Sequence, residues 1–263
     1  MCKKTKNAFF ARKRTLRTHK QKPPEPRRTP SPPQMKRAHS DTTSDTTSED
    51  KPLKKPPVEE NENKAEDGLS EGMVLILDTS QSMYHLYDKF SKAVEILLKT
   101  RVKAGSPVTI VWFNGKIKIV DCTDTDTAVE KVQAPKFGCG TALYAAVERG
   151  MAHGLKKHKG VNVTAVILTD GENNCEPESP SGAQSQVAAA REKGWHVMFL
   201  GVTENAFQAG SALGVGADHS LSVSVSSQAT VEAFAAVSSS SRRFASGDSS
   251  GFTRAERVAS SLE

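Results

Sequence analysis

The alternation of apolar runs with amphipathic stretches constrains the fold of this chain most. Residues 73–77 form a continuous apolar run, which is typical of a strand buried on both faces of a sheet. Residues 108–113 and 161–168 are two more apolar segments that predict strands. Residues 86–102 carry apolar side chains three and four positions apart, which predicts an amphipathic helix. Strands that alternate with helices predict an α/β fold with a mostly parallel sheet.

Further segments extend this pattern along the chain. Asn114-Gly115 is a strong hairpin signal, and the alternation over 116–120 predicts an antiparallel edge strand that is half exposed to water. An apolar segment at 195–201 and a weaker one near 219–223 bring the expected number of strands to about six. Helices are expected near residues 124–132, 141–153, 184–193, 205–213 and 230–238.

The positive charge of the chain is concentrated at its N-terminal end. Residues 1–40 hold 13 Lys and Arg and one acidic residue, residues 41–71 hold 4 and 10, and residues 72–263 hold 19 of each. The net charge of +6 therefore belongs to a tail on a neutral domain, and does not indicate a nucleic-acid-binding domain.

Composition also predicts the domain boundaries. Nine of the 13 prolines precede residue 58, and large apolar side chains are scarce up to Gly72, so we expect residues 1–71 to be a disordered, Pro-rich tail that is basic and then acidic. One domain is expected over 72–240. Residues 241–263 are expected to be a Ser-rich tail, in which Thr253 and Glu256 fit the capping box of a short helix; a frayed end is the alternative.

The sequence favours an intracellular protein without a membrane span. It contains no apolar stretch of about 18 residues and no apolar segment typical of a secretory signal near its start. Four cysteines without a CxxC pair favour reduced thiols. The basic residues 1–40 leave four interpretations open: a nuclear import signal, a nucleic-acid-binding arm, a mitochondrial transit peptide and a merely solvated tail.

Carboxylate and hydroxyl side chains follow the predicted strands 73–77 and 161–168. An open α/β sheet binds ligands at the carboxyl ends of its strands, where the strand order reverses. Hard oxygen donors suit Mg²⁺ or Mn²⁺ and do not suit zinc or copper. The alternatives are helix capping by the serines and a turn role for the second aspartate. We predict a site for Mg²⁺ (or Mn²⁺) formed by Asp78, Ser80, Ser82, Thr141 and Asp170.

These residues resemble the metal-ion-dependent adhesion site of the von Willebrand factor A family. The resemblance implies a doubly wound, mostly parallel sheet with helices on both faces. It also implies that an acidic side chain of a partner protein completes the coordination of the ion. Asp78 and Asp170 would hold the ion through water, and three hydroxyls would coordinate it directly: those of Ser80, Ser82 and Thr141.

The chain most resembles stand-alone bacterial and viral members of this family, over about residues 73–257. The similarity is carried by Gly-Thr-Ala-Leu at 140–143, Leu-Thr-Asp-Gly-Glu-Asn at 168–173, Gly-Trp at 194–195 and Phe-Thr-Arg-Ala-Glu-Arg at 252–257. One departure is Ala145, where such sequences often have Asp, and it puts a secondary contact in doubt.

We therefore expect a metal-dependent protein-interaction module and not an enzyme. Signatures of a P-loop, a dinucleotide-binding turn and a serine nucleophile are missing from the sequence. Two alternatives stay open: a nucleic-acid-associated protein that binds through residues 1–40, and a metal-assisted hydrolase. Cys139 and Cys175 flank the predicted site and form a candidate redox pair.

Overall fold

The structure is a computed structural model that describes residues 70, 72–159, 162–202 and 205–261. Residues 1–69 of the predicted N-terminal tail are outside the described residues. The predicted nuclear or nucleic-acid-binding role of residues 1–40 therefore stays a prediction.

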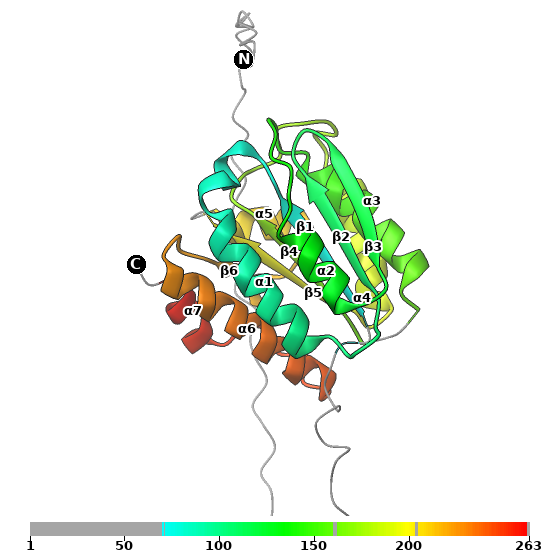
Figure 1. The fold of residues 1–263 in the computed structure, drawn as a ribbon, viewed down its shortest axis with the longest axis vertical. Coiled ribbons are helices and arrows are strands. Elements are labelled where there is room, and N and C mark those ends of the chain that lie inside the picture. The colour runs from blue at the N-terminus through cyan, green and yellow to red at the C-terminus, as the bar shows by residue number, and fades with distance from the viewer. Residues whose placement is uncertain (1–69, 71, 160–161, 203–204, 262–263) are drawn as a thin grey trace, which may run out of the picture. The chain divides into compact units, whose positions relative to one another are not determined.

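Six strands form one sheet in the order β3-β2-β1-β4-β5-β6 (Figure 1). All neighbouring pairs are parallel except β2 and β3, which are antiparallel. The prediction of a mostly parallel sheet of about six strands with an antiparallel edge strand is therefore confirmed. The strands are β1 Gly72–Asp78, β2 Val108–Phe113, β3 Ile117–Cys122, β4 Val163–Thr169, β5 His196–Gly201 and β6 Ser220–Ser222.

Helices cover both faces of the sheet, as expected for a doubly wound fold (Figure 1). The helices are α1 Tyr87–Arg101, α2 Thr125–Val132, α3 Leu143–Lys157, α4 Ser181–Glu192, α5 Ala206–Ala212, α6 Ser227–Ala245 and α7 Arg254–Ser260, with short 3-10 turns η2 Gln81–His85 and η3 Ala217–His219.

The two faces of β1 bury alternate side chains in two separate cores. Met73, Leu75 and Leu77 pack with apolar residues of α1, α2 and α6. Val74 and Ile76 pack with apolar residues of α3 and α4 on the other face. Every residue of β1 is buried, which explains why its sequence is a continuous apolar run.

The β2–β3 hairpin confirms the Asn114-Gly115 turn signal. Phe113 pairs with Ile117, so the connection is a three-residue loop of residues 114–116. Glycine is required in this loop because a Cβ on Gly115 would lie 2.6 Å from the carbonyl oxygen of Cys139. The backbone of the hairpin thus packs directly on the segment that precedes α3.

The last long helix, α6, extends further than the sequence indicates. Helix α6, at Ser227–Ala245, is longer at both ends than the predicted helix near 230–238. The serine run at 238–241 hid this extension because serine is a weak helix former, yet Ser240 and Ser241 are buried. The capping box of Thr253 and Glu256 is present at the start of α7.

Helix α7 is anchored to strand β6 and to the chain before it. The Arg257 guanidinium donates hydrogen bonds to the carbonyl oxygens of Ser220 at 2.7 Å and Asp218 at 2.9 Å. Ser260 Oγ donates to the carbonyl oxygen of Ser222 at 2.9 Å. Arg243 of α6 pairs with Glu256 of α7 at 2.8 Å. Polar contacts therefore hold the C-terminal helix against the last strand.

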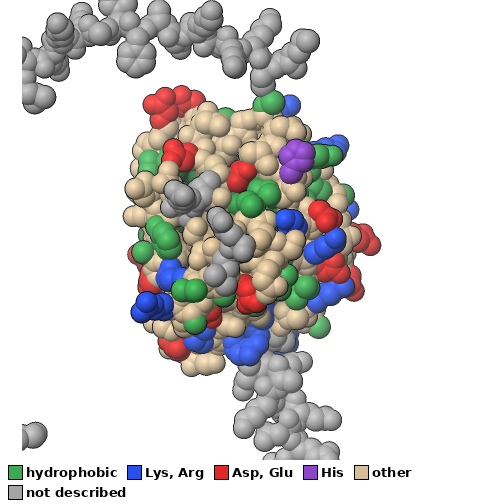
Figure 2. All heavy atoms as spheres, turned by 90° about the vertical axis from the view of Figure 1, so that its left-hand side faces the viewer, with side chains coloured by type: hydrophobic (Ala, Val, Ile, Leu, Met, Phe, Trp, Pro, Cys, Tyr) green, Lys and Arg blue, Asp and Glu red, His purple; other side chains and the backbone are tan. Residues whose placement is uncertain are grey.

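The side of the domain that carries α6 and α7 shows apolar side chains in small groups among charged and polar atoms (Figure 2). Within the described part of the chain, no helix combines the length and the apolar character needed to cross a membrane.

We predict that Arg257→Ala lowers the free energy of unfolding by about 1.5–3 kcal/mol, because it leaves carbonyl groups at β6 without a charged donor. Urea denaturation followed by circular dichroism measures this change. Arg254→Ala is the matched control, since Arg254 is exposed on the same helix, and its effect should stay within about 0.5 kcal/mol. Equal losses from both variants would contradict the anchoring role of Arg257.

Candidate metal centre

The predicted site residues lie at the edge of the sheet where the strand order reverses. From β1 the chain adds β2 and β3 on one side, and β4, β5 and β6 on the other. The carboxyl ends of β1 and β4 are therefore neighbours at this edge, as Leu77 pairs with Leu168. The segment before α3 joins them, because Ser80 forms a parallel bridge with Gly138. A ligand-binding site is expected at such a switch point.

A chain of hydrogen bonds links three of the five predicted residues. Ser80 Oγ and Ser82 Oγ lie 3.0 Å apart, and Ser82 Oγ donates to Asp170 Oδ1 at 3.0 Å. Ser80 is almost fully buried, whereas Ser82 is exposed and Asp170 is half-buried. The residues therefore connect the interior of the sheet edge to solvent.

Asp78 is the most deeply buried of the five predicted site residues. Its side chain has no solvent exposure, and it accepts hydrogen bonds from the Thr169 hydroxyl at 2.6 Å and from the Ser80 N–H at 2.7 Å. Burial raises the pKa of the Asp78 carboxyl to about 6, although both hydrogen bonds act to lower it and the Asp170 carboxylate raises it further. The described groups that shift this pKa include no cationic side chain, so a bound cation would supply the missing positive charge.

Thr141 is held in place by two hydrogen bonds between its backbone and Asn174. The Thr141 N–H donates to Asn174 Oδ1 at 2.7 Å, and the Asn174 N–H donates to the Thr141 carbonyl at 3.0 Å. Thr141 Oγ1 lies beside Gly171, since a Cβ on that glycine would be 3.7 Å from the hydroxyl oxygen. Thr141 therefore points to the loop that begins at Asp170.

Asn114 connects the β2–β3 hairpin to the same edge. Its side-chain amide donates to Thr79 Oγ1 at 3.3 Å and to the Lys136 carbonyl at 3.2 Å. Its backbone carbonyl accepts from the Ala142 N–H at 2.8 Å. Asn114 thus positions the neighbours of Ser80 and of Thr141.

The five donors were predicted from the sequence, but the residues that position them were not. Thr169 and Asn174 each contact a predicted site residue, and Asn114 contacts the neighbours of two. Thr169 is the last residue of β4 and Asn174 lies in the loop after it, so their place close to Asp170 in the sequence was the available signal. No local pattern could reveal the contact of Asn114 with residues 35 and 22 positions away.

The donor chemistry of these residues fits a hard divalent cation. Carboxylate and hydroxyl oxygens from three chain segments meet at one edge, and oxygen is the donor that Mg²⁺ and Mn²⁺ prefer. Among the described residues, no group of three or more His, Cys, Asp or Glu side chains could hold a metal ion. A cation here would therefore depend on the hydroxyls of Ser80, Ser82 and Thr141 in addition to the two carboxylates.

Cys139 and Cys175 stand as free thiols on loops that flank Gly140. A Cβ on Gly140 would lie 3.0 Å from Cys175 Sγ, and this glycine adopts a positive φ of 84°. The predicted redox pair stays a prediction.

Comparisons with known proteins agree with the fold described above. The family model described as von Willebrand factor type A domain matches residues 73–241. No curated protein matches the chain. Proximal thread matrix protein 1 of the mussel byssus aligns with a TM-score of 0.54 at 14% identity, over 64% of this chain and 46% of that one. The pilus adhesin SpaC of Lactobacillus rhamnosus GG aligns with a TM-score of 0.53 at 14% identity, over 66% of this chain and 31% of that one.

These two solved structures share the fold of the chain, and the alignments span less than half of each.

We predict that Thr169→Val destabilises the domain by about 1.5–3 kcal/mol, because it removes the hydroxyl that donates to the buried Asp78 carboxylate while keeping the side-chain volume. Urea titration at pH 8 measures the loss. Thr169→Ser retains the hydroxyl and should recover most of the stability. A valine variant as stable as the serine variant would contradict this role.

Proposed function

This chain belongs to the von Willebrand factor type A family, a family of protein-interaction modules, and from that premise we propose that its domain binds a protein partner through a divalent cation. The cation is Mg²⁺ or Mn²⁺, and the partner contributes an Asp or Glu side chain. The residues that hold the cation are Asp78, Ser80, Ser82, Thr141 and Asp170.

The hydrogen-bonded chain from Ser80 through Ser82 to Asp170 carries this proposal. Its members come from the ends of β1 and β4, which are adjacent only because the strand order reverses there. Thr141, almost fully buried, approaches the same point from the segment before α3.

Because hydroxyl groups carry no charge, a cation that they hold keeps an affinity for a further carboxylate. A hydroxyl polarises toward a cation but does not neutralise it, so an ion held largely by hydroxyls keeps positive charge. An acidic side chain from outside neutralises that charge and completes the oxygen ligands. We propose that the site acts by this binding alone and performs no chemical step.

We predict that Mg²⁺ at about a hundredfold above its Kd raises the melting temperature of the domain by roughly 5–10 °C. Asp78→Ala and Thr141→Ala should each abolish the increase, because each removes one oxygen donor. Asp126→Ala is the matched carboxylate control, since Asp126 is exposed on α2, and it should keep the full increase. Differential scanning fluorimetry with and without EDTA measures the change, and an unchanged increase in both site variants would contradict the proposed cation site.

We predict that a peptide with one glutamate binds the Mg²⁺-loaded domain and that its glutamine counterpart does not, because only the carboxylate neutralises the ion. Isothermal titration calorimetry measures both. Binding that persists in EDTA, or equal binding of the two peptides, would contradict carboxylate recognition through the cation.

A further inference from the structure

We propose that a basic groove beside the metal centre holds an acidic segment that flanks the metal-binding carboxylate of the partner. We call it the lysine groove. The inference rests on the proposed function and specifies the partner: a protein segment with two or more further carboxylates and an apolar side chain close to the first acidic residue. The groove is formed mainly by Lys116, Lys118, Lys136, Trp112 and Phe137.

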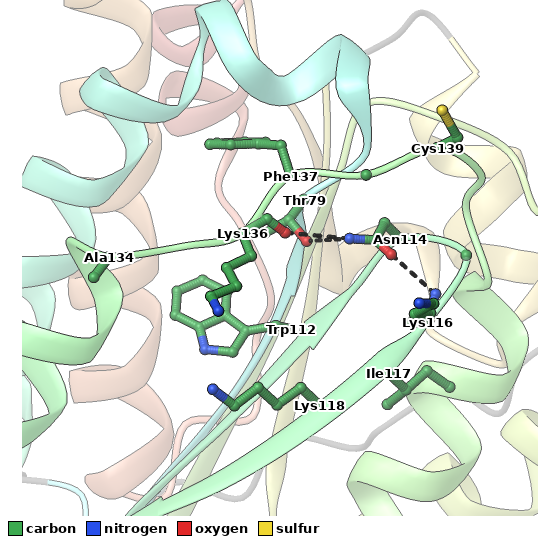
Figure 3. Close-up of a pocket in the computed structure, with 12 residues that line it drawn as sticks. Thr79, Trp112, Asn114, Lys116, Ile117, Lys118, Ala134, Lys136, Phe137 and Cys139 are labelled. Carbon is green, nitrogen blue, oxygen red and sulfur yellow. Dashed lines mark hydrogen bonds between the residues drawn. The ribbon is translucent and has the colours of Figure 1, made fainter. Parts of the chain in front are cut away.

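The lysine groove is a cavity of about 690 Å³ between the β2–β3 hairpin and residues 134–139 (Figure 3). Its inner end is lined by Thr79 and Gly138, which are the chain neighbour and the bridge partner of Ser80. The groove therefore begins next to a predicted cation ligand. A chain that places one side chain at the cation can place its next residues in the groove.

Aromatic rings give the groove an apolar wall. Trp112 lies in its floor with 8% exposure, and Phe137 packs edge-on against Tyr87 at 5.4 Å between ring centroids. Tyr84, two residues after Ser82, packs against Phe137 at 5.2 Å and is 56% exposed. A large aromatic side chain exposed near a site is a common anchor for a partner.

The three lysines supply unneutralised positive charge. In Figure 3 the side chains of Lys118 and Lys136 extend toward the Trp112 ring from opposite sides of the groove. Lys118 is the cross-strand neighbour of Trp112 in the hairpin, and Asn114 fixes the backbone of Lys136. Among the described residues, no carboxylate forms an ion pair with any of the three lysines. Carboxylates of a partner would complement this charge.

The loop after β4, which begins at Asp170, carries the opposite charge. The loop after β4 contains Glu172, Glu176 and Glu178, all exposed, and the last two line a separate hollow. A polyanion such as nucleic acid, with regular charge along its length, would meet repulsion there. A protein segment whose carboxylates are confined to a few residues beside its metal-binding residue can place them at the lysines and keep them away from these glutamates.

The test uses the full chain with Trp195→Phe, which leaves Trp112 as the only tryptophan and makes its fluorescence report on the groove. Two synthetic peptides are titrated in Mg²⁺: one with a single glutamate, and one with that glutamate followed by three more and a phenylalanine. We expect the acidic-aromatic peptide to bind about tenfold more tightly, the gain expected from two or three exposed ion pairs. It should also change the Trp112 emission, whereas the single-glutamate peptide should not.

The paired variant Lys118→Glu/Lys136→Glu should reduce the tenfold preference to about one and leave the affinity for the single-glutamate peptide within twofold. Lys156→Glu/Lys159→Glu is the matched control, because these lysines are also exposed, and it should keep the preference. A Mg²⁺-dependent increase in melting temperature in every variant shows that the fold and the cation site are intact.

The outcomes separate this inference from the proposed function. Equal, Mg²⁺-dependent binding of both peptides to the unmodified groove would overturn the lysine groove and leave the cation site standing. Tight binding of the acidic-aromatic peptide in EDTA would support the groove and overturn carboxylate recognition through the cation. In a competition experiment, a short oligothymidylate is compared with unlabelled peptide as the competitor. If the oligothymidylate displaced the bound peptide at the lower concentration, the assignment of the groove to a protein partner would be overturned.

Discussion

The buried carboxylate of Asp78 is the constraint on which the sheet edge depends. A carboxylate without solvent exposure must find hydrogen-bond donors inside the protein, and here they come from Thr169 at the end of β4 and from the Ser80 backbone. These contacts fix the relative position of the central strands β1 and β4 at the edge where the strand order reverses. Because the Ser80 backbone also bridges to Gly138, the same network sets where the segment before α3 can lie. The hydroxyls that could hold a cation are thus placed by the same interactions that stabilise the edge.

The sequence predicts the parts of this arrangement that are encoded locally. A continuous apolar run marked β1, and a polar cluster directly after it marked the start of the site, because a buried strand leaves its first solvent-facing residues at the carboxyl end. The extension of α6 through a serine run was not predictable, since it depends on burial of Ser240 against the sheet and not on helix propensity. The lysine groove was equally hidden, because Trp112 and Phe137 become neighbours only when residues 134–139 pack on the hairpin.

Exposed side chains of both charges lie near the candidate metal centre. Lysines of the β2–β3 hairpin and of residues 134–139 line one hollow, and glutamates of the loop after β4 line another. Within residues 72–263 acidic and basic residues balance, so this separation is local and does not reflect the net charge. A cation alone would accept any accessible carboxylate. The lysines and glutamates near the site would select among acidic partners.

The anchoring of α7 has a consequence for association of the domain with itself. An open sheet ends in strands whose outer backbone groups can pair with a strand of another molecule. At the β6 edge these groups are occupied: Arg257 binds the Ser220 carbonyl, and Ser260 binds the Ser222 carbonyl. The Ser224 N–H just beyond the strand donates to the Ser260 carbonyl. The last helix therefore covers this end of the sheet against intermolecular strand addition, so loss of α7 would leave the β6 edge open to a strand of another molecule.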